Sequence, residues 1–225
     1  MFRKACIEDL AKVYKISEKR MREERGNVKI VLIDNEHVNA AADSLKKAGY
    51  VNVTPLPNLT AIEEVAPFDI VLIDVKGIGA RYLKGSRSAS LEGIAVAREI
   101  KRLYPLKKVI VFSAMLNEYK DHFVLHGVVD DVFAKDEDIT VRNQKIDRCI
   151  RERIDPVEQW KRYRIALLEN GVSIYKVADL ENEYVDAIMG RKTVSENDVK
   201  KIIGTTTTLV EIVKGIVEII GIAAC

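Results

Sequence analysis

Between Val28 and Ile139 the sequence alternates short apolar runs with helical segments, and this alternation constrains the fold more than any other feature. Five runs have the length and β-branched content of strands: VKIVLID, YVNVTPL, FDIVLID, KKVIVFSA and DDVFAK. The segments between them place apolar residues at helical spacing: HVNAAADSLKKAG, LTAIEEVA, LEGIAVAREIKRLY and EYKDHFVLHG. Near-continuous apolar strands are typical of a parallel sheet covered on both faces. We therefore predict an α/β fold with a five-stranded, doubly wound parallel sheet.

Both flanks of this region have helical patterns only. Residues 1–26 place Ile7, Leu10, Tyr14 and Met21 on one face and end at a glycine, which predicts an amphipathic N-terminal helix. From residue 140 onward, prolines and glycines interrupt a series of helical segments. We therefore expect three parts: an N-terminal helix (1–26), an α/β domain (27–139) and a C-terminal helical domain (140–225).

Composition excludes several classes of protein. The net charge of +2 gives no global field that would attract nucleic acid or a membrane surface. Three cysteines, Cys6, Cys149 and Cys225, lie far apart and form no CxxC pair, so neither a disulfide framework nor a zinc ribbon is expected. No secretory signal and no long apolar run is present. We expect a cytoplasmic protein without a membrane span.

Polar side chains follow the predicted strands at the points where they end. Strand one ends in Asp34, Asn35 and Glu36, strand three in Asp74, strand four in Ser113 and strand five in Lys135. The carboxyl ends of parallel strands share one edge, where such sheets bind ligands. Clustered acids hold Mg²⁺, a lysine neutralises a phosphoryl group, and a carboxylate can be its acceptor. The pattern predicts a phosphoryl-accepting site at this edge.

These residues resemble the receiver domain of two-component response regulators. The blocks VLIDNE, DIVLID, VIVFSA and DDVFAK occur in the order that the family shows, and the step from Ser113 to Lys135 is similar to the family's usual spacing. The resemblance extends over the α/β region and leaves the helical tail unrecognised.

The resemblance implies a role for each of these residues. Asp74 would be the phospho-acceptor, and Asp34, Asp74 and the backbone carbonyl of Lys76 would hold Mg²⁺. Ser113 and Lys135 would sense and pair with the phosphate. Receivers take their phosphoryl group from a histidine kinase or a phosphotransfer protein. We accordingly expect a phosphorelay signalling protein and not an enzyme.

The sequence also departs from the family. Asn35 stands where receivers usually have a second acid, so an amide oxygen or Glu36 would have to complete the metal site. Val132 replaces an aromatic residue that rotates on phosphorylation in many receivers, and Asp136 replaces the usual proline. The alternative is therefore a pseudo-receiver adaptor that binds partners and is never phosphorylated.

The loop 75–92 is longer than its counterpart in a typical receiver and must lie over the acids. Its glycines permit close backbone approach or a lid motion. Four basic residues in it could attract an anion: Lys76, Arg81, Lys84 and Arg87. The other interpretation is a solvated, flexible loop.

Other candidate sites are weaker. His122 and His126 share a predicted helix face but have no evident further ligand, and we favour no metal site there. Trp160 and Tyr163 lie among basic residues, which can indicate nucleic-acid contact. We expect instead that these aromatics pack on the α/β domain.

The C-terminal region leaves several possibilities open. Residues 170–202 faintly resemble a helix-turn-helix, but the interval from Ala178 to Tyr184 is too short for the turn, so DNA binding is possible but not favoured. The tail helix 209–224 is apolar around most of its circumference, apart from a stripe of Glu211, Lys214 and Glu218. It must be buried in the helical domain, in a second subunit or in a membrane interface. We expect packing with the N-terminal helix or across a homo-oligomer.

Overall fold

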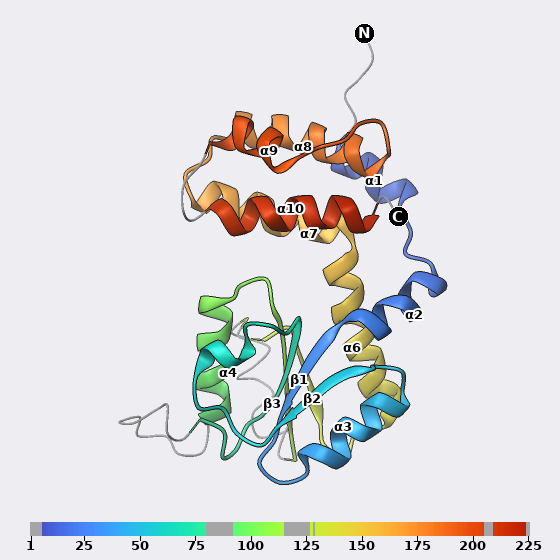
Figure 1. Ribbon diagram of the computed structural model, residues 1–225, viewed down its shortest axis with the longest axis vertical. Helices are drawn as coiled ribbons and strands as arrows, with labels where there is room; N and C mark the ends of the chain where they lie inside the picture. Colours follow the sequence, from blue (N-terminus) through green and yellow to red (C-terminus); the bar gives the residue numbers. More distant parts are fainter. Residues whose placement is uncertain (1–5, 80–91, 115–126, 128, 205–208, 224–225) are drawn as a thin grey trace. The chain divides into compact units, whose positions relative to one another are not determined.

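The computed structural model describes residues 6–79, 92–114, 127, 129–204 and 209–223 (Figure 1). The chain forms two compact units. Ser17–Ile150 make up the first, called the sheet unit here, and Met1–Ile16 together with Arg151–Cys225 make up the second, the helical unit. The divisions fall at residues 16/17 and 150/151, whereas we expected them at 26/27 and 139/140.

The sheet unit contains a single parallel sheet of five strands in the order β2-β1-β3-β4-β5. The strands are β1 (Lys29–Ile33), β2 (Asn52–Leu56), β3 (Ile70–Asp74), β4 (Lys108–Ser113) and β5 (Asp131–Ala134) (Figure 1). Every neighbouring pair is parallel. The predicted doubly wound sheet is confirmed, and its order is the flavodoxin-like one.

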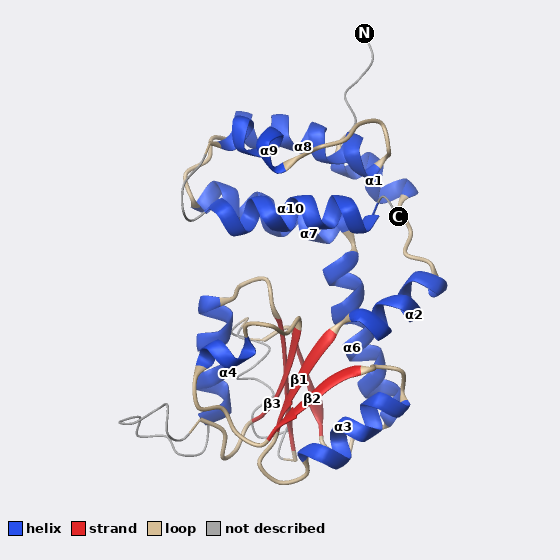
Figure 2. Cartoon of the chain, in the orientation of Figure 1, coloured by secondary structure: helices blue, strands red, loops and turns tan. Residues whose placement is uncertain are grey.

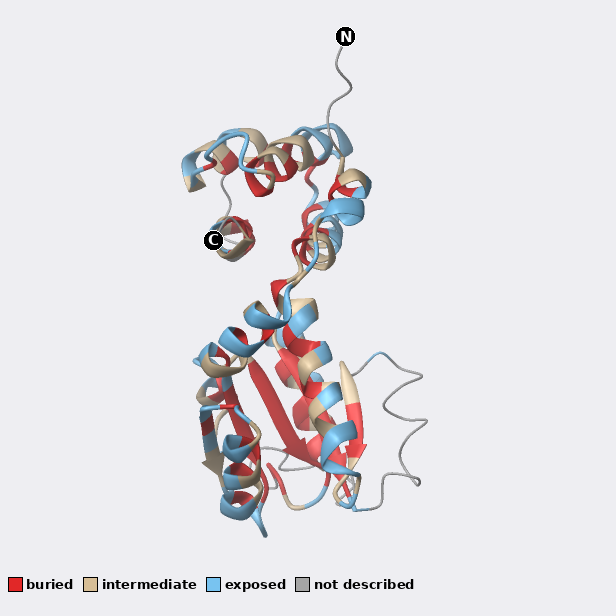
Figure 3. Ribbon diagram, turned by 90° about the vertical axis from the view of Figure 1, so that its right-hand side faces the viewer, coloured by how far each residue is buried: buried red, intermediate tan, exposed pale blue. Residues whose placement is uncertain are grey.

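Helices cover both faces of this sheet (Figure 2). Val31 and Ile33 of β1 pack with α4 (Glu92–Leu103) and with η1 (Ile62–Val65), a 3₁₀ turn where we expected a short α-helix. Leu32, between them, lies on the other face with Ala41 of α3 (Val38–Lys47). Because both faces are covered, every residue of β3 and β4 is buried, as the red strands of Figure 3 show.

Two helices from distant parts of the sequence complete the sheet unit. Arg25 in α2 (Glu18–Asn27) donates from Nε to Asp147 in α6 (Ile139–Ile154) at 2.8 Å and makes a second bond to it through Nη2. The hydroxyl of Tyr50 donates to the same carboxylate at 3.0 Å and to the carbonyl of Asn143 at 3.1 Å. Burial raises the pKa of Tyr50, so its hydroxyl remains a donor. These bonds fasten α6 to the sheet unit.

The expected N-terminal helix is in fact two helices. α1 spans Ile7–Val13, and α2 begins again after Ser17, whose hydroxyl accepts a hydrogen bond from the amide of Arg20 at 3.1 Å. A serine at this position stabilises the start of a new helix, which explains why one amphipathic pattern is divided. The two halves bury their apolar residues in different units: Leu10 in the helical unit and Met21 in the sheet unit.

The helical unit has one apolar core. It is formed by α1, α7 (Pro156–Glu169), α8 (Ile174–Ile188), α9 (Glu196–Ile203) and α10 (Val210–Ala223). Trp160 and Tyr184 stack in it with ring centroids 4.9 Å apart, and the Tyr184 hydroxyl donates to the Pro156 carbonyl at 2.8 Å. Trp160 and Tyr163 therefore pack within the helical unit and not on the α/β domain as we expected, because both point into this core.

The tail helix is buried in this same core. α10 contributes Ile212, Val213, Ile216, Ile219 and Ile220. We expected the apolar surface of this helix to be covered by the helical domain, a second subunit or a membrane interface. The structure shows the first of these. α1 lies in the same core, where it packs on α7 and α8.

Two further features bear on partners. α8 runs unbroken from Ile174 to Ile188, so the interval from Ala178 to Tyr184 contains no turn of a helix-turn-helix. Within the described ranges, no helix combines the length and the apolar character needed to cross a bilayer.

Candidate functional site

The carboxyl edge of the sheet brings together three of the predicted site residues. Asp34 directly follows β1, Asp74 is the last residue of β3, and Lys135 directly follows β5. β1 and β3 are hydrogen-bonded neighbours in register, so the two carboxylates emerge side by side. Lys135 reaches them across the end of β4.

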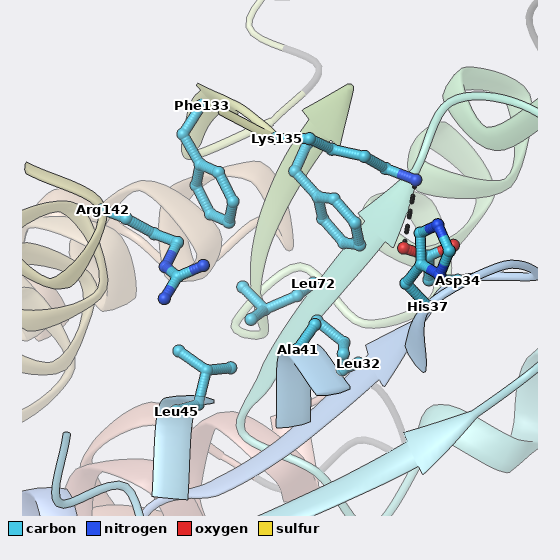
Figure 4. Close-up of a pocket in the computed structure, with 10 residues that line it drawn as sticks. Leu32, Asp34, His37, Ala41, Leu45, Leu72, Phe133, Lys135 and Arg142 are labelled. Carbon is cyan, nitrogen blue, oxygen red and sulfur yellow. Dashed lines mark ion pairs between the residues drawn. The ribbon is translucent and has the colours of Figure 1, made fainter. Parts of the chain in front are cut away.

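The ammonium of Lys135 bridges the two carboxylates. Its Nζ lies 2.8 Å from Asp74 Oδ2 and 3.0 Å from Asp34 Oδ2, and the second contact is the dashed line in Figure 4. The remaining oxygens accept backbone hydrogen bonds: Asp34 Oδ1 from the amide of Glu36 at 2.9 Å, and Asp74 Oδ1 from that of Val75 at 2.7 Å. Both acids are almost completely buried, so this arrangement fixes their geometry.

Burial and charge oppose each other at this cluster. Burial raises the pKa of Asp74 above its usual range, although the hydrogen bond and positive charge of Lys135 act in the other direction. Burial alone would lower the pKa of Lys135, but its hydrogen bonds to Asp74 and Asp34 outweigh burial and raise it. The lysine is therefore firmly protonated at neutral pH and is a fixed positive charge beside Asp74.

The ring of Phe112 lies close to the same ammonium. Lys135 Nζ is 5.5 Å from the ring centroid, a distance at which a cation is attracted to an aromatic face. Phe112 in turn stacks on Phe133 with centroids 5.6 Å apart. The contact between Phe112 and Lys135 could not be predicted, because in the sequence Phe112 is one more apolar residue of a strand.

Ser113 lies at the same edge. It is buried as the last residue of β4, and its carbonyl accepts a hydrogen bond from the backbone amide of Lys135 at 3.1 Å. Phe112 is the register partner of Asp74, so Ser113 lies one residue beyond the level of Asp74 on the adjacent strand. The structure thus places the predicted hydroxyl residue beside Asp74 and Lys135.

The additional residues expected for a metal site are exposed. Asn35, Glu36 and Lys76 all face solvent. The Asn35 amide lies against Gly77, because a Cβ built at Gly77 would be only 2.2 Å from Asn35 Nδ2. Asn35 therefore bridges the end of β1 and the start of the loop after β3.

This donor set fits Mg²⁺. The ion commonly binds proteins through one or two carboxylates, with water and phosphate oxygens completing its shell. Asp34 and Asp74 supply that pair, and the Asn35 amide oxygen is close by in the adjoining turn. In the part of the chain that the structure describes, no three His, Cys, Asp or Glu side chains gather at a possible metal site.

The long loop is held at both of its ends. Asn58 Oδ1 accepts hydrogen bonds from the amides of Leu59 at 2.8 Å and Gly79 at 3.1 Å, which fixes the first residues after β3. At the other end, the amide of Gly93 donates to the Val75 carbonyl at 2.9 Å. Several predicted residues lie outside the described ones: Arg81, Lys84, Arg87, His122 and His126.

Val132, where receivers often have an aromatic residue, is buried in the apolar core on the α4 face of the sheet. Asp136 follows Lys135 directly. The substitution at Val132 thus fills the core and places no aromatic ring at the edge of the sheet.

Several solved structures that match the chain are response-regulator receiver domains, and they cover about 55% of it, leaving the C-terminal region unmatched. The receiver domain of NtrX from Brucella abortus is 23% identical, with a TM-score of 0.42, covering 54% of this chain and 98% of its own. A receiver domain protein from Clostridium thermocellum is 19% identical, with a TM-score of 0.45, covering 56% and 95%. The response regulator TrrA from Thermotoga maritima, in complex with Mg²⁺ and BeF, is 19% identical, with a TM-score of 0.41, covering 54% and 98%. No family model matches the sequence, and no curated protein matches it.

The fold of the sheet unit is identified by its strand order and by the position of the charged residues at one edge. The sheet has the order β2-β1-β3-β4-β5, and Asp34, Asp74 and Lys135 meet at its carboxyl edge. The sheet unit has the receiver fold. The two acids at its carboxyl edge, Asp34 and Asp74, are those for which the sequence resemblance implied a role.

Proposed function

We propose that this protein is a response-regulator-like signalling protein that is phosphorylated on Asp74 with Mg²⁺. The phosphoryl group would come from a histidine kinase or a phosphotransfer protein, and its arrival would control packing, partner binding or oligomerisation of the helical regions. The observation that supports this function most directly is the single lysine ammonium held between two buried carboxylates. A fixed positive charge beside a carboxylate suits a group that must receive a phosphoryl anion.

The proposed step is a transfer between two nucleophiles. An oxygen of ionised Asp74 attacks the phosphorus, a new O–P bond forms, and the bond from phosphorus to the donor breaks. The donor is an imidazole nitrogen of a phosphohistidine, which leaves with the bonding electron pair. Magnesium bound through Asp34 and Asp74 would neutralise part of the phosphoryl charge. Lys135, now 2.8 Å from Asp74, would pair with the new phosphoryl oxygens, and Ser113 would donate a hydrogen bond to one of them.

The output of this step would run through α6. The helix spans Ile139–Ile154, and the division between the two units falls within it, after Ile150. Lys145 in its middle donates to the Val132 carbonyl of β5 at 2.9 Å, three residues before Lys135. A change at Lys135 therefore has a short covalent and hydrogen-bonded route to a helix that both units share.

A second function is favoured by one observation. Asn35 replaces an acid, and its amide is already engaged against the turn at Gly77. Lys135 already pairs with both carboxylates without any phosphoryl group. In this alternative the protein is a pseudo-receiver adaptor whose helices bind a partner.

Intact-mass spectrometry after incubation with Mg²⁺ and acetyl phosphate separates the two functions. We expect one added phosphoryl group, its absence in Asp74→Asn, and its presence in Asp43→Asn, which removes an exposed acid of α3. Omitting Mg²⁺ should suppress the addition. A response regulator should also change its elution volume or its proteolysis pattern on phosphorylation. If no donor, including a phosphorylated phosphotransfer protein, adds mass to Asp74, the adaptor function replaces the first.

A further inference from the structure

A pocket lies beneath the acid cluster, on the face of the sheet that α3 and α6 cover. Its volume is about 160 Å³. Six apolar residues form most of its wall: Leu32, Ala41, Leu45, Leu72, Phe112 and Phe133. An apolar cavity of about 150 Å³ holds a molecule the size of benzene. The space is thus large enough for a small ring or a short alkyl chain.

The charged residues of the pocket lie on two sides. Figure 4 shows Lys135, Asp34 and His37 on one side and Arg142 on the other, with the apolar residues between them. Lys135 Nζ lies 3.0 Å from Asp34 and 2.8 Å from Asp74, so two carboxylates share its one positive charge. His37 is exposed at the start of α3. The positive charge that remains to be matched is that of Arg142.

Arg142 is aimed into the pocket without an acid to pair with. Its Nη2 donates to the Ser44 hydroxyl at 2.9 Å, but its buried Nε has no hydrogen-bond partner among the described residues. Burial lowers the pKa of Arg142, and no carboxylate acts against that effect. Leaving a buried guanidinium N–H unsatisfied costs free energy. A guanidinium that pairs with no acid among the described residues, beside an apolar space, has the chemistry of a carboxylate-binding site.

We propose that this pocket binds a small monocarboxylate with an aromatic or short aliphatic body. The carboxylate accepts hydrogen bonds from the guanidinium of Arg142, while the body fills the space between Leu45, Leu72 and Phe133. One negative charge suffices, because it balances the one positive charge of Arg142, which forms no ion pair with a described acid. This site is separate from the phosphoryl-accepting oxygens of Asp74, which does not line the pocket. The inference stands whether or not Asp74 is phosphorylated.

Residues of the pocket also contact the acid cluster and belong to α6. Phe112 lines it and lies under the Lys135 ammonium, and Arg142 is part of α6. A bound carboxylate would therefore fix one residue of the helix that both units share. The ligand is a candidate regulator of that helix.

Calorimetric titration of the full chain with benzoate tests the inference. A ligand of this size should bind with a Kd on the order of 1 mM. Benzyl alcohol has a similar body without the charge, and acetate has the charge without the body, so both should bind much more weakly. Equal binding of benzyl alcohol and benzoate would overturn the role of the carboxylate, and no heat with benzoate would overturn the pocket's ligand class.

Two variants and a matched control locate the binding. Arg142→Gln should weaken benzoate by about tenfold or more, since a charge-assisted hydrogen bond is lost. Arg148→Gln removes an arginine of the same helix that pairs with Asp131 outside the pocket, and it should leave benzoate binding unchanged. Ala41→Leu fills the space and should abolish binding while leaving Arg142 in place. Benzoate that still binds to Ala41→Leu, or that binds equally to Arg142→Gln, would show that it does not occupy this pocket.

Discussion

Asp130, directly before β5, pairs with two lysines: Lys108 at the start of β4 and Lys101 in the last turn of α4. Its Oδ1 lies 3.1 Å from Lys108 Nζ, its Oδ2 lies 2.9 Å from Lys101 Nζ, and Oδ2 also accepts from the amide of Val109 at 2.9 Å. The side chain of Lys108 has an exposed fraction of 0%. A fully buried ammonium needs this carboxylate, because removing one partner of a buried pair leaves an uncompensated charge.

We expect Asp130→Asn to lower the free energy of unfolding by about 3 kcal/mol. Burial alone would raise the pKa of Asp130, but Lys101 and Lys108 outweigh burial, and the pKa is lowered on folding. The stabilisation is therefore complete above the unfolded pKa of about 3.9 and is lost as the pH falls through the lower folded value. Urea unfolding should show the full difference at pH 7 and a smaller one below pH of about 4.

The exposed acid Asp43 provides the control for this measurement. Asp43→Asn should change the urea midpoint little at either pH, since exposed substitutions usually have small effects. Equal midpoints for Asp130→Asn and the unaltered protein at neutral pH would mean that Lys108 is neutralised by some other group.

Because Gly93 has no side chain, α4 can approach the end of β3 closely. A Cβ built at Gly93 would lie 2.0 Å from the Asp74 carbonyl oxygen and 2.9 Å from Val75 Cα. These are backbone atoms, so α4 or the strand end must move to accept a side chain. We expect Gly93→Ala to lower the free energy of unfolding by about 2 kcal/mol, measured by urea unfolding.

Gly26 is the matched control for Gly93. It lies inside α2, and a Cβ there would meet nothing within 4 Å. Gly26→Ala should raise the stability by about 0.5 to 1 kcal/mol through helix propensity alone. If both substitutions shift the midpoint in the same direction, close packing at Gly93 is not the reason for that glycine.

Local patterns predicted the elements well where they are repeated and strongly apolar. The runs around Val31, Leu72 and Ile110 marked three adjacent strands, and the polar residue after each run marked the carboxyl edge. The helix expected over residues 59–66 is a 3₁₀ turn, because so short a segment has no periodicity with which to distinguish the two.

The pairing of distant residues was beyond these patterns. One ammonium bridges Asp34 and Asp74 because of the order and register of the strands, which cannot be deduced from the sequence alone. Arg142 looks like any exposed arginine of an amphipathic helix until α3 is placed beside it. The periodicity of α1 identified its apolar residues but could not identify their partners, which lie about 150 positions further along the chain.

At the scale of the whole molecule, the helical unit is assembled from both ends of the sequence. Ile7 and Leu10 of α1 are buried in the core formed by α7 to α10. The carboxylate of Glu181 joins the two parts, since it accepts from the amide of Ile7 at 3.4 Å and from Trp160 Nε1 at 2.7 Å. Neither part of the sequence contains this whole core.

Peptide complementation tests this assembly. We expect a fragment of residues 151–225 to be unstable alone and to be stabilised by a peptide of residues 1–16. Trp160 is the single tryptophan, so its fluorescence reports the change directly. A Leu10→Ala peptide should bind much more weakly, because truncating a buried leucine costs about 2 to 5 kcal/mol.

A Lys12→Ala peptide is the control, since Lys12 is exposed. It should complement the fragment as well as the unaltered peptide does. Full stability of residues 151–225 without any peptide would show that α1 is dispensable for the helical core.

The two parts of the helical core are synthesised at different times. Ribosomes add about 5 to 20 residues per second, so α1 is made about 7 to 30 seconds before Trp160. The sheet unit lies entirely between them and can close while α1 still has no partner. During that interval Ile7 and Leu10 are exposed on a nascent chain. The apolar surface of α1 thus leaves the ribosome long before its partners do, and it is the natural place for a chaperone to bind.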